Sequence, residues 1–139
     1  MAEESTTPNV ERTRRSFEAG STRDVDAAMS AYGPESVWDM SQIGLGTYEG
    51  VAAIRSFFED WLASYDELEM EVEELLDLGN GVVFFAVRQK ARLAGSPGHV
   101  ELRYAGFTLW VDGVAMRVRN YADIDEARTA AERLAESRG

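Results

Sequence analysis

A change of hydrophobic period near Glu67 constrains the fold of this chain more than any other feature. Before that point, large apolar residues recur at helical spacing and predict an amphipathic helix with a wide aromatic face. They are Val51, Ile54, Phe57, Phe58, Trp61, Leu62 and Tyr65. After that point, apolar and charged residues alternate with the period of two that is typical of strands. Turn sequences divide this second region into strands at 67–78, 82–92, 99–111 and 114–121.

The charges on the first two of these strands predict how the strands pair. Glutamates alternate on the first strand and basic residues on the second: Glu67, Glu69, Glu71 and Arg88, Lys90, Arg92. The alternation slips at Glu73 and Glu74, which indicates a β-bulge, because a bulge adds one residue to one strand. Counting back through the Gly79-Asn80-Gly81 turn then places the glutamates opposite the basic residues. We therefore expect cross-strand ion pairs along this hairpin.

The remaining segments predict helices and one more strand. A Thr7-Pro8 start predicts a helix over 8–19, and a second helix ends near Tyr32. Residues 36–39 are expected to form a short strand, and residues 125–136 an alanine-rich helix. Helices grouped first, followed by a mostly antiparallel meander, predict an α+β fold. A curved sheet wrapped over the N-terminal helices would leave a pocket between the two layers.

Length and composition limit the organisation of the chain and its compartment. Residues 1–7 are expected to form a disordered N-terminal segment and residues 8–139 a single domain. No apolar run approaches the ~20 residues of a membrane span and no signal peptide is recognisable, so we expect a cytoplasmic protein. The formal net charge of −11 argues against binding to nucleic acid or to anionic membranes.

The residue types also exclude several kinds of chemistry. The chain has no cysteine, so disulfides, zinc–thiolate sites and thiol nucleophiles are excluded. His99 is the only histidine and has no second ligand at metal-binding spacing, so no metal site is expected. The glycines within residues 44–50 lack the spacing of a phosphate-binding loop, and no cofactor is expected.

Three motifs follow one another along the predicted elements in an order that is typical of one fold family. They are Trp38-Asp39, the run T-Y-E-G-V-A-A-I-R-S-F-F at 47–58, and Asp112-Gly113-Val114. Together they resemble the nuclear transport factor 2-like superfamily, most closely its SnoaL-like and ketosteroid isomerase-like branch. The resemblance covers nearly the whole chain and implies a cone, in which a curved, mostly antiparallel sheet wraps over the N-terminal helices and a C-terminal helix follows. It does not fix the activity, because this fold carries isomerases, cyclases, dehydratases, epoxide hydrolases and binding domains.

The resemblance implies a role for Asp39. This residue falls where ketosteroid isomerases keep the aspartate that shuttles a proton beside a carbonyl. The positions of the two oxyanion donors and of a supporting tyrosine hold Ser16, Ala105 and Phe58 here, so steroid isomerase activity is not expected. On the last strand, Asn120 replaces the carboxylate with which limonene-epoxide hydrolase-like enzymes activate water. A SnoaL-like polyketide cyclase is the enzymatic activity that these residues contradict least.

The residues themselves leave the place of Asp39 open. Its carboxylate could cap a loop amide among residues 41–46, or it could face the pocket as an acid/base or hydrogen-bond acceptor. Strand alternation places Asn120 inward. It also places Arg103 on the side of Phe107, which we expect to face the cavity, although Arg103 could instead be exposed and paired with a surface acid.

Two functions follow from these expectations. The candidate ligand-binding residues are Phe17, Phe58, Trp61, Arg103, Phe107 and Asn120, whose aromatic members could also be ordinary core residues. The first function is a binding protein whose apolar, aromatic-lined pocket takes a small hydrophobic molecule. The second is a small cofactor-independent enzyme, a cyclase, isomerase or hydrolase, that acts on a hydrophobic carbonyl compound through Asp39.

Trp110 and Tyr104 share the other face of the long strand, and an aromatic outer face predicts a homodimer that covers it.

Overall fold

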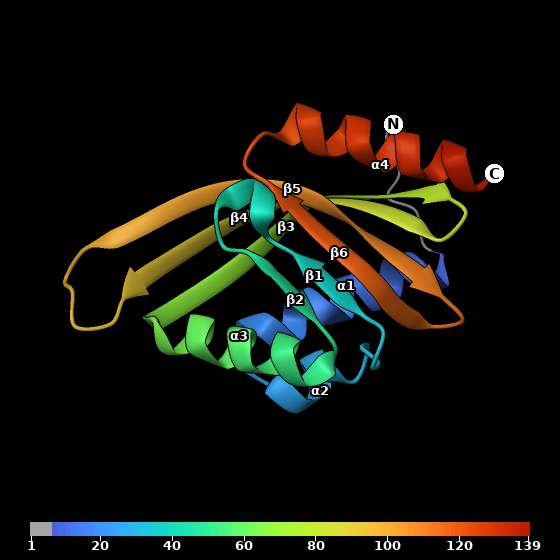
Figure 1. Ribbon diagram of the computed structural model, residues 1–139. Helices are drawn as coiled ribbons and strands as arrows, with labels where there is room; N and C mark the ends of the chain where they lie inside the picture. The colour runs from blue at the N-terminus through green and yellow to red at the C-terminus, as the bar shows by residue number, and fades with distance from the viewer. Residues whose placement is uncertain (1–6) are drawn as a thin grey trace.

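A computed structural model describes residues 7–139 of the chain (Figure 1). Disorder is expected for residues 1–7, and residues 1–6 of this segment lie outside the described residues. The helices are α1 (Pro8–Ser21), α2 (Val25–Met29), η1 (Ser41–Ile43, a 3-10 turn), α3 (Val51–Ala63) and α4 (Ile124–Arg138). The strands are β1 (Val37–Asp39), β2 (Thr47–Glu49), β3 (Tyr65–Gly79), β4 (Val82–Leu93), β5 (His99–Val111) and β6 (Val114–Tyr121).

The strands form one curved sheet with helices on both faces. Their order is β2-β1-β6-β5-β4-β3, and every neighbouring pair is antiparallel except β1 and β6. In Figure 1, α1, α2 and α3 lie on one side of the sheet, and α4 lies on the other. The predicted α+β class, with N-terminal helices under the sheet and a C-terminal helix, is confirmed.

The pairing of β3 with β4 has the predicted register. The observed pairs are Glu67–Arg92, Glu69–Lys90 and Glu71–Arg88. The register shifts directly after Val72, which is the predicted bulge. The ion pairs follow the prediction only in part: Arg92 Nε lies 3.7 Å from Glu67 Oε1, whereas Arg88 Nη2 lies 3.2 Å from Glu73 Oε2.

The structure reverses the two faces that the sequence analysis assigned to β5. Tyr104 and Trp110 face the N-terminal helices, and Trp110 Nε1 donates a hydrogen bond of 2.9 Å to Thr13 Oγ1 on α1. Phe107 is 4% exposed and packs on the opposite face, under α4. The contact is possible because α4 presents a stripe of small side chains, Ala127, Ala131 and Ala135. The aromatic face that suggested a covering subunit is therefore the inner face of the sheet.

Two short elements were not predicted. Strand β2 pairs with β1, and η1 lies in the loop between them. Neither is long enough to show a period in the sequence, so the region reads only as a glycine-rich loop. Within residues 7–139, no helix is both long and apolar enough to cross a membrane.

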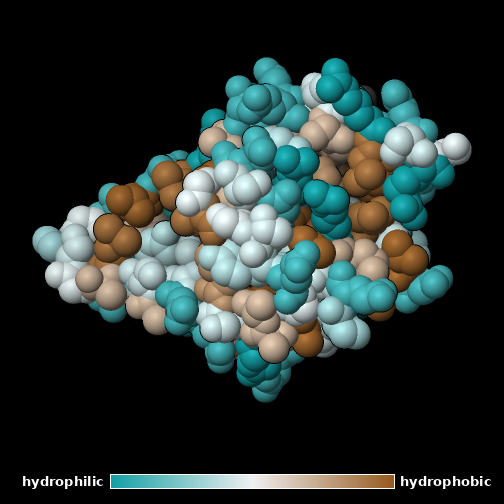
Figure 2. Space-filling view, in the orientation of Figure 1, coloured by the Kyte–Doolittle hydropathy of each residue, from teal (hydrophilic) through white to brown (hydrophobic). Residues whose placement is uncertain are grey.

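Most of the surface in Figure 2 is polar, with apolar residues in small groups. One such group lies at the end of the sheet that β4 and β5 form, on the left of the view. Leu93, Val100 and Leu102, from these two strands, are among the exposed large apolar side chains.

Candidate functional site

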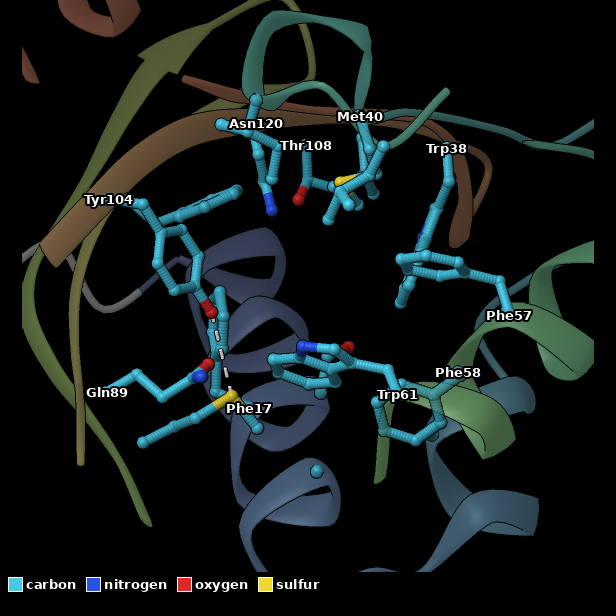
Figure 3. A pocket seen from close by; sticks show the side chains of 18 of the residues that line it. Phe17, Trp38, Met40, Phe57, Phe58, Trp61, Gln89, Tyr104, Thr108 and Asn120 are labelled. Carbon is cyan, nitrogen blue, oxygen red and sulfur yellow. Dashed lines mark hydrogen bonds between the residues drawn. The ribbon is translucent and has the colours of Figure 1, made fainter. Parts of the chain in front are cut away.

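A cavity of about 350 Å³ lies between the concave face of the sheet and the helices α1 and α3 (Figure 3). Its walls come from these two helices, from β1 and the loop that follows it, and from β3, β4, β5 and β6. Small-molecule sites have volumes of roughly 300–1,000 Å³, so this cavity is at the lower end of that range.

Aromatic rings from α1, α3 and β1 form one side of the cavity, here called the aromatic wall. The ring centroid of Trp38 lies 5.9 Å from that of Phe57 and 5.9 Å from that of Phe58, both edge-on. Trp61 lies 6.0 Å from Phe58, and Phe17 adds a ring from α1. Edge-on contacts of this kind are favourable, so the rings hold one another in place. They offer a flat apolar ligand a preformed surface.

Three of the polar side chains on the sheet side of the cavity form a diagonal row. The members of this polar row are Gln89 on β4, Tyr104 on β5 and Asn120 on β6. In the ladder Gln89 pairs with Leu102 and Asn120 pairs with Gly106, so Tyr104 is the diagonal neighbour of both. Diagonal neighbours on one face are ~7–8 Å apart, so the row crosses the cavity.

The polar row has unused hydrogen-bonding groups. Within residues 7–139, Gln89 Oε1 and Asn120 Oδ1 are buried and have no hydrogen-bond partner. The Tyr104 hydroxyl donates only to the Met70 sulfur at 3.7 Å, the dashed line in Figure 3, and a thioether is a weak acceptor. A buried carbonyl without a partner costs about 1–3 kcal/mol. A ligand that bonds to the row would remove that cost.

Burial disfavours ionisation of two of the phenols that line the cavity, Tyr32 and Tyr104. It raises the pKa of Tyr32 and the pKa of Tyr104 above the ordinary value for tyrosine, so both hydroxyls are donors near neutral pH. Trp38 packs edge-on against Tyr32, with 5.7 Å between ring centroids. It lowers the pKa of Tyr32 by less than burial raises it. The buried Trp38 Nε1 makes no hydrogen bond of ordinary geometry with the described residues.

The inside of the cavity is uncharged. Of the residues that the structure describes, no aspartate, glutamate or histidine lines it, and Arg103 is the lining residue with a permanent charge. The Arg103 guanidinium is 3.0 Å from Glu73 Oε2, and its side chain is 55% exposed. Arg103 therefore lies at the rim with its charge paired to a surface acid, which is the second of the two places that the sequence left open.

Asp39 caps a loop and does not line the cavity. Its Oδ1 accepts a hydrogen bond of 3.0 Å from Ser41 N, a second from the Ser41 hydroxyl, and a long one of 3.4 Å from Thr47 Oγ1. Its Oδ2 lies 3.3 Å from Arg119 Nε and 3.5 Å from Arg117 Nη2. The structure thus selects the first of the two places that the sequence left open.

Strand alternation explains this place. Trp38 and Met40 line the cavity, so Asp39 between them points to the opposite face of β1. Burial raises the pKa of Asp39, but the bonds from Ser41 and the charges of the two arginines outweigh it and hold the pKa below its ordinary value. A general base near neutral pH needs a shift in the other direction.

The structure brings together most of the predicted ligand residues. Phe17, Phe58, Trp61, Arg103 and Asn120 all line the cavity. Phe107 does not, because it lies on the face that α4 covers.

Sequence reasoning missed Gln89, Tyr104 and Trp38. The signal for Gln89 was present: its strand neighbours Arg88 and Lys90 are charged, so alternation puts uncharged Gln89 on the opposite, inner face. Tyr104 was assigned to the outside with the rest of its face.

Comparisons with known proteins agree on the fold. Residues 13–119 match the family model for the SnoaL-like domain. A comparison with curated proteins finds no match. Among solved structures, a putative SnoaL-like polyketide cyclase from Jannaschia sp. CCS1 has a TM-score of 0.74 at 19% identity, covering 94% of this chain and 98% of its own.

Two further structures have similar scores. TerC, co-crystallised with polyporic acid, has a TM-score of 0.73 at 20% identity, with 91% of this chain and 99% of that chain covered. An LEH-like epoxide hydrolase from M. tuberculosis has a TM-score of 0.70 at 14% identity, with 93% of this chain and 92% of that chain covered. These identities show the fold alone, and the predicted cone-shaped fold is confirmed.

Proposed function

Because the chain belongs to the SnoaL-like domain family, we propose that its cavity binds an uncharged, mainly apolar small molecule that carries at least one hydroxyl or carbonyl oxygen. The observation that carries the proposal is the pair of buried, unpartnered oxygens, Gln89 Oε1 and Asn120 Oδ1, among side chains of a cavity whose lining is mainly apolar and aromatic. Buried polar groups in proteins are nearly always hydrogen-bonded, and those left free mark a place for a ligand or a water molecule.

The surroundings of the row support this class of ligand. The aromatic wall offers area to a flat ring system, and the neutral Tyr104 hydroxyl offers a donor to a ligand oxygen. A carboxylate on the ligand would meet no opposite charge inside, so it would lose hydration without compensation. TerC, a structural neighbour, is co-crystallised with polyporic acid, which supports a small organic ligand for this fold but not its lack of charge.

The enzymatic alternative, with Asp39 as an acid/base, has weaker support. The similarity of the fold to two putative SnoaL-like polyketide cyclases favours it. The bonds of Asp39 and its position outside the cavity do not, because an acid/base must reach the proton that it moves. We therefore prefer binding to catalysis.

A titration series tests the proposal with three probes of the same ring size. Calorimetry would compare 2-naphthol, naphthalene and 2-naphthoate with the full chain at neutral pH. We expect 2-naphthol to bind about tenfold more tightly than naphthalene, since one hydrogen bond in a dry site is worth about 1.4 kcal/mol. We expect 2-naphthoate to bind most weakly. Preference for 2-naphthoate, or failure of 2-naphthol to bind, would refute the proposal.

We further propose a cytoplasmic homodimer formed through the outer sheet face that α4 leaves open. Cross-strand pairs put charges of both signs on this face: Glu67, Glu69, Glu71, Glu73, Glu101 and Arg88, Lys90, Arg92, Arg103. Five negative and four positive charges nearly cancel there, whereas the whole chain carries −11, so two copies would repel each other only weakly across this face. A monomer mass by light scattering at micromolar concentration would contradict the dimer.

A further inference from the structure

Asp39 holds both ends of the loop that follows β1. Its Oδ1 accepts from the Ser41 amide at 3.0 Å, where the loop begins, and from Thr47 Oγ1 at 3.4 Å, where it ends. Its Oδ2 lies within 3.5 Å of Arg117 and Arg119, which are both on β6. One carboxylate thus ties the two ends of the loop to each other and to the sheet. The side chain has a relative exposure of only 10%, so water does not easily replace these bonds.

The loop at 41–46 forms part of the cavity wall. Ile43 and Leu45 both line the cavity, and Leu45 is 45% exposed, so this side chain lies between the cavity and solvent. Leu45 is flanked by Gly44 and Gly46, which have φ values of +79° and +87° in the left-handed region that glycine enters without strain. Residues that tolerate such angles suit a segment that changes conformation.

Backbone bonds also close the loop, among them those from Ile43 N to Met40 O and from Gly44 N to Ser41 O, both of 3.1 Å. Met40 N donates to Gly46 O at 2.8 Å, Leu45 N donates to Met40 O at 3.0 Å, and the Tyr48 hydroxyl donates to Leu45 O at 2.7 Å. The loop makes no ladder pairing with the sheet between β1 and β2. Opening it would uncover the cavity beside Leu45 while α3 and the sheet stay in place.

We propose that Asp39 is a positioning residue that holds the loop at 41–46 closed as the gate of the cavity. The gate rests on the proposed function, because it matters only if a ligand enters. Asp39 acts through Ser41 and Thr47 and does not touch the ligand. Replacing the carboxylate with an uncharged side chain removes its attraction to Arg117 and Arg119 and weakens its bonds to Ser41 and Thr47. The backbone bond between Met40 and Gly46 remains, but the open form becomes more populated and small neutral solutes reach the cavity faster.

The test needs no ligand. Asp39→Asn is compared with Asp77→Asn as a matched control, because Asp77 also caps a turn, with Oδ1 accepting from Gly79 N at 2.8 Å, and that turn lines no cavity. Hydrogen exchange of the loop amides and acrylamide quenching of tryptophan fluorescence are measured on each full chain. Acrylamide is small and neutral, and Trp38 and Trp61 line the cavity that it would enter.

We expect Asp39→Asn to speed exchange at the Ser41 and Leu45 amides at least tenfold and to raise the acrylamide quenching constant at least twofold. Asp77→Asn should change neither, although both variants lower the melting temperature. Ser41→Ala, at an exposed position, should give a smaller change in the same direction, and it serves if Asp39→Asn does not fold. Equal loop exchange and equal quenching in these variants and the wild type would overturn the proposal.

This outcome is separable from that of the proposed function. If 2-naphthol fails to bind while the variants differ as expected, the ligand class is wrong and the positioning role of Asp39 stands. If 2-naphthol binds while the loop exchange of Asp39→Asn equals that of the wild type, the ligand class stands and the positioning role is refuted.

Discussion

Replacing Gln89 with leucine should stabilise the unliganded protein and weaken its binding of an oxygen-bearing ligand. The side chain is 2% exposed, and its Oε1 has no hydrogen-bond partner among the described residues. Leucine has a similar volume and no polar atoms, so the change removes a cost of about 1–3 kcal/mol. For a chain of this length that corresponds to a rise in melting temperature of several degrees.

The same substitution removes one hydrogen bond to the ligand. We expect the Kd of 2-naphthol to rise about tenfold, because a neutral hydrogen bond in a dry site is worth about 1.4 kcal/mol. Naphthalene has no hydroxyl, so its Kd should stay constant or fall. Gln89→Met, which keeps an unbranched side chain, is the second variant, and it should behave as Gln89→Leu does.

Differential scanning calorimetry and titration calorimetry on the same preparations measure both effects. If Gln89→Leu raises the melting temperature and also raises the Kd of 2-naphthol, Gln89 contributes to ligand binding and lowers the stability of the unliganded protein. If Gln89→Leu lowers the melting temperature by several degrees, Gln89 has a structural partner and the reasoning is refuted. If the Kd values for 2-naphthol and naphthalene change equally, the row does not bind the hydroxyl.

Three further predictions follow from the same structure. Phe107→Leu should cost about 1 kcal/mol in urea unfolding and leave the Kd of 2-naphthol unchanged, whereas Phe17→Leu should raise that Kd, since only Phe17 lines the cavity. Gly106→Ala should destabilise the protein by about 3 kcal/mol in urea unfolding, because a Cβ there would collide with the Arg119 carbonyl oxygen and lie 2.9 Å from Phe85 Cζ. The lowered pKa of Asp39 adds stability above its unfolded pKa of about 3.9 and loses it as pH falls through the folded value, so Asp39→Asn should flatten urea stability measured between pH 5 and 2.

The features of the fold that depend on a regular pattern along the sequence were predictable. The alternation on both strands, the slip at Glu73 and the turn at Asn80 were together enough to fix the register of β3 on β4. Each is a local signal that a single chain carries. The element order then identified the fold, because few architectures accommodate it.

The orientation of the sheet faces could not be predicted in the same way. Alternation separates Tyr104 from Phe107 but does not say which of them faces α1 and which faces α4. Both faces of β5 are apolar near its end, so burial gave no preference. The alanine stripe of α4 was the available clue, since small side chains need a large partner such as Phe107 to fill the space.

The place of Asp39 was within reach of the sequence. Trp38 and Met40 on either side are large and apolar, and alternation then turns Asp39 to the opposite face. The resemblance to ketosteroid isomerases pointed to a catalytic aspartate instead. The bonds to Arg117 and Arg119 depend on the parallel pairing of β1 with β6, which no local pattern reveals.

A crystal structure of the protein with 2-naphthol tests the central claim most directly. We predict that the rings lie in the cavity against the aromatic wall, with the hydroxyl about 3 Å from the amide of Gln89 or Asn120 or from the Tyr104 oxygen. A 2-naphthol molecule bound outside the cavity, or one inside it whose hydroxyl touches none of these three groups, would contradict the account.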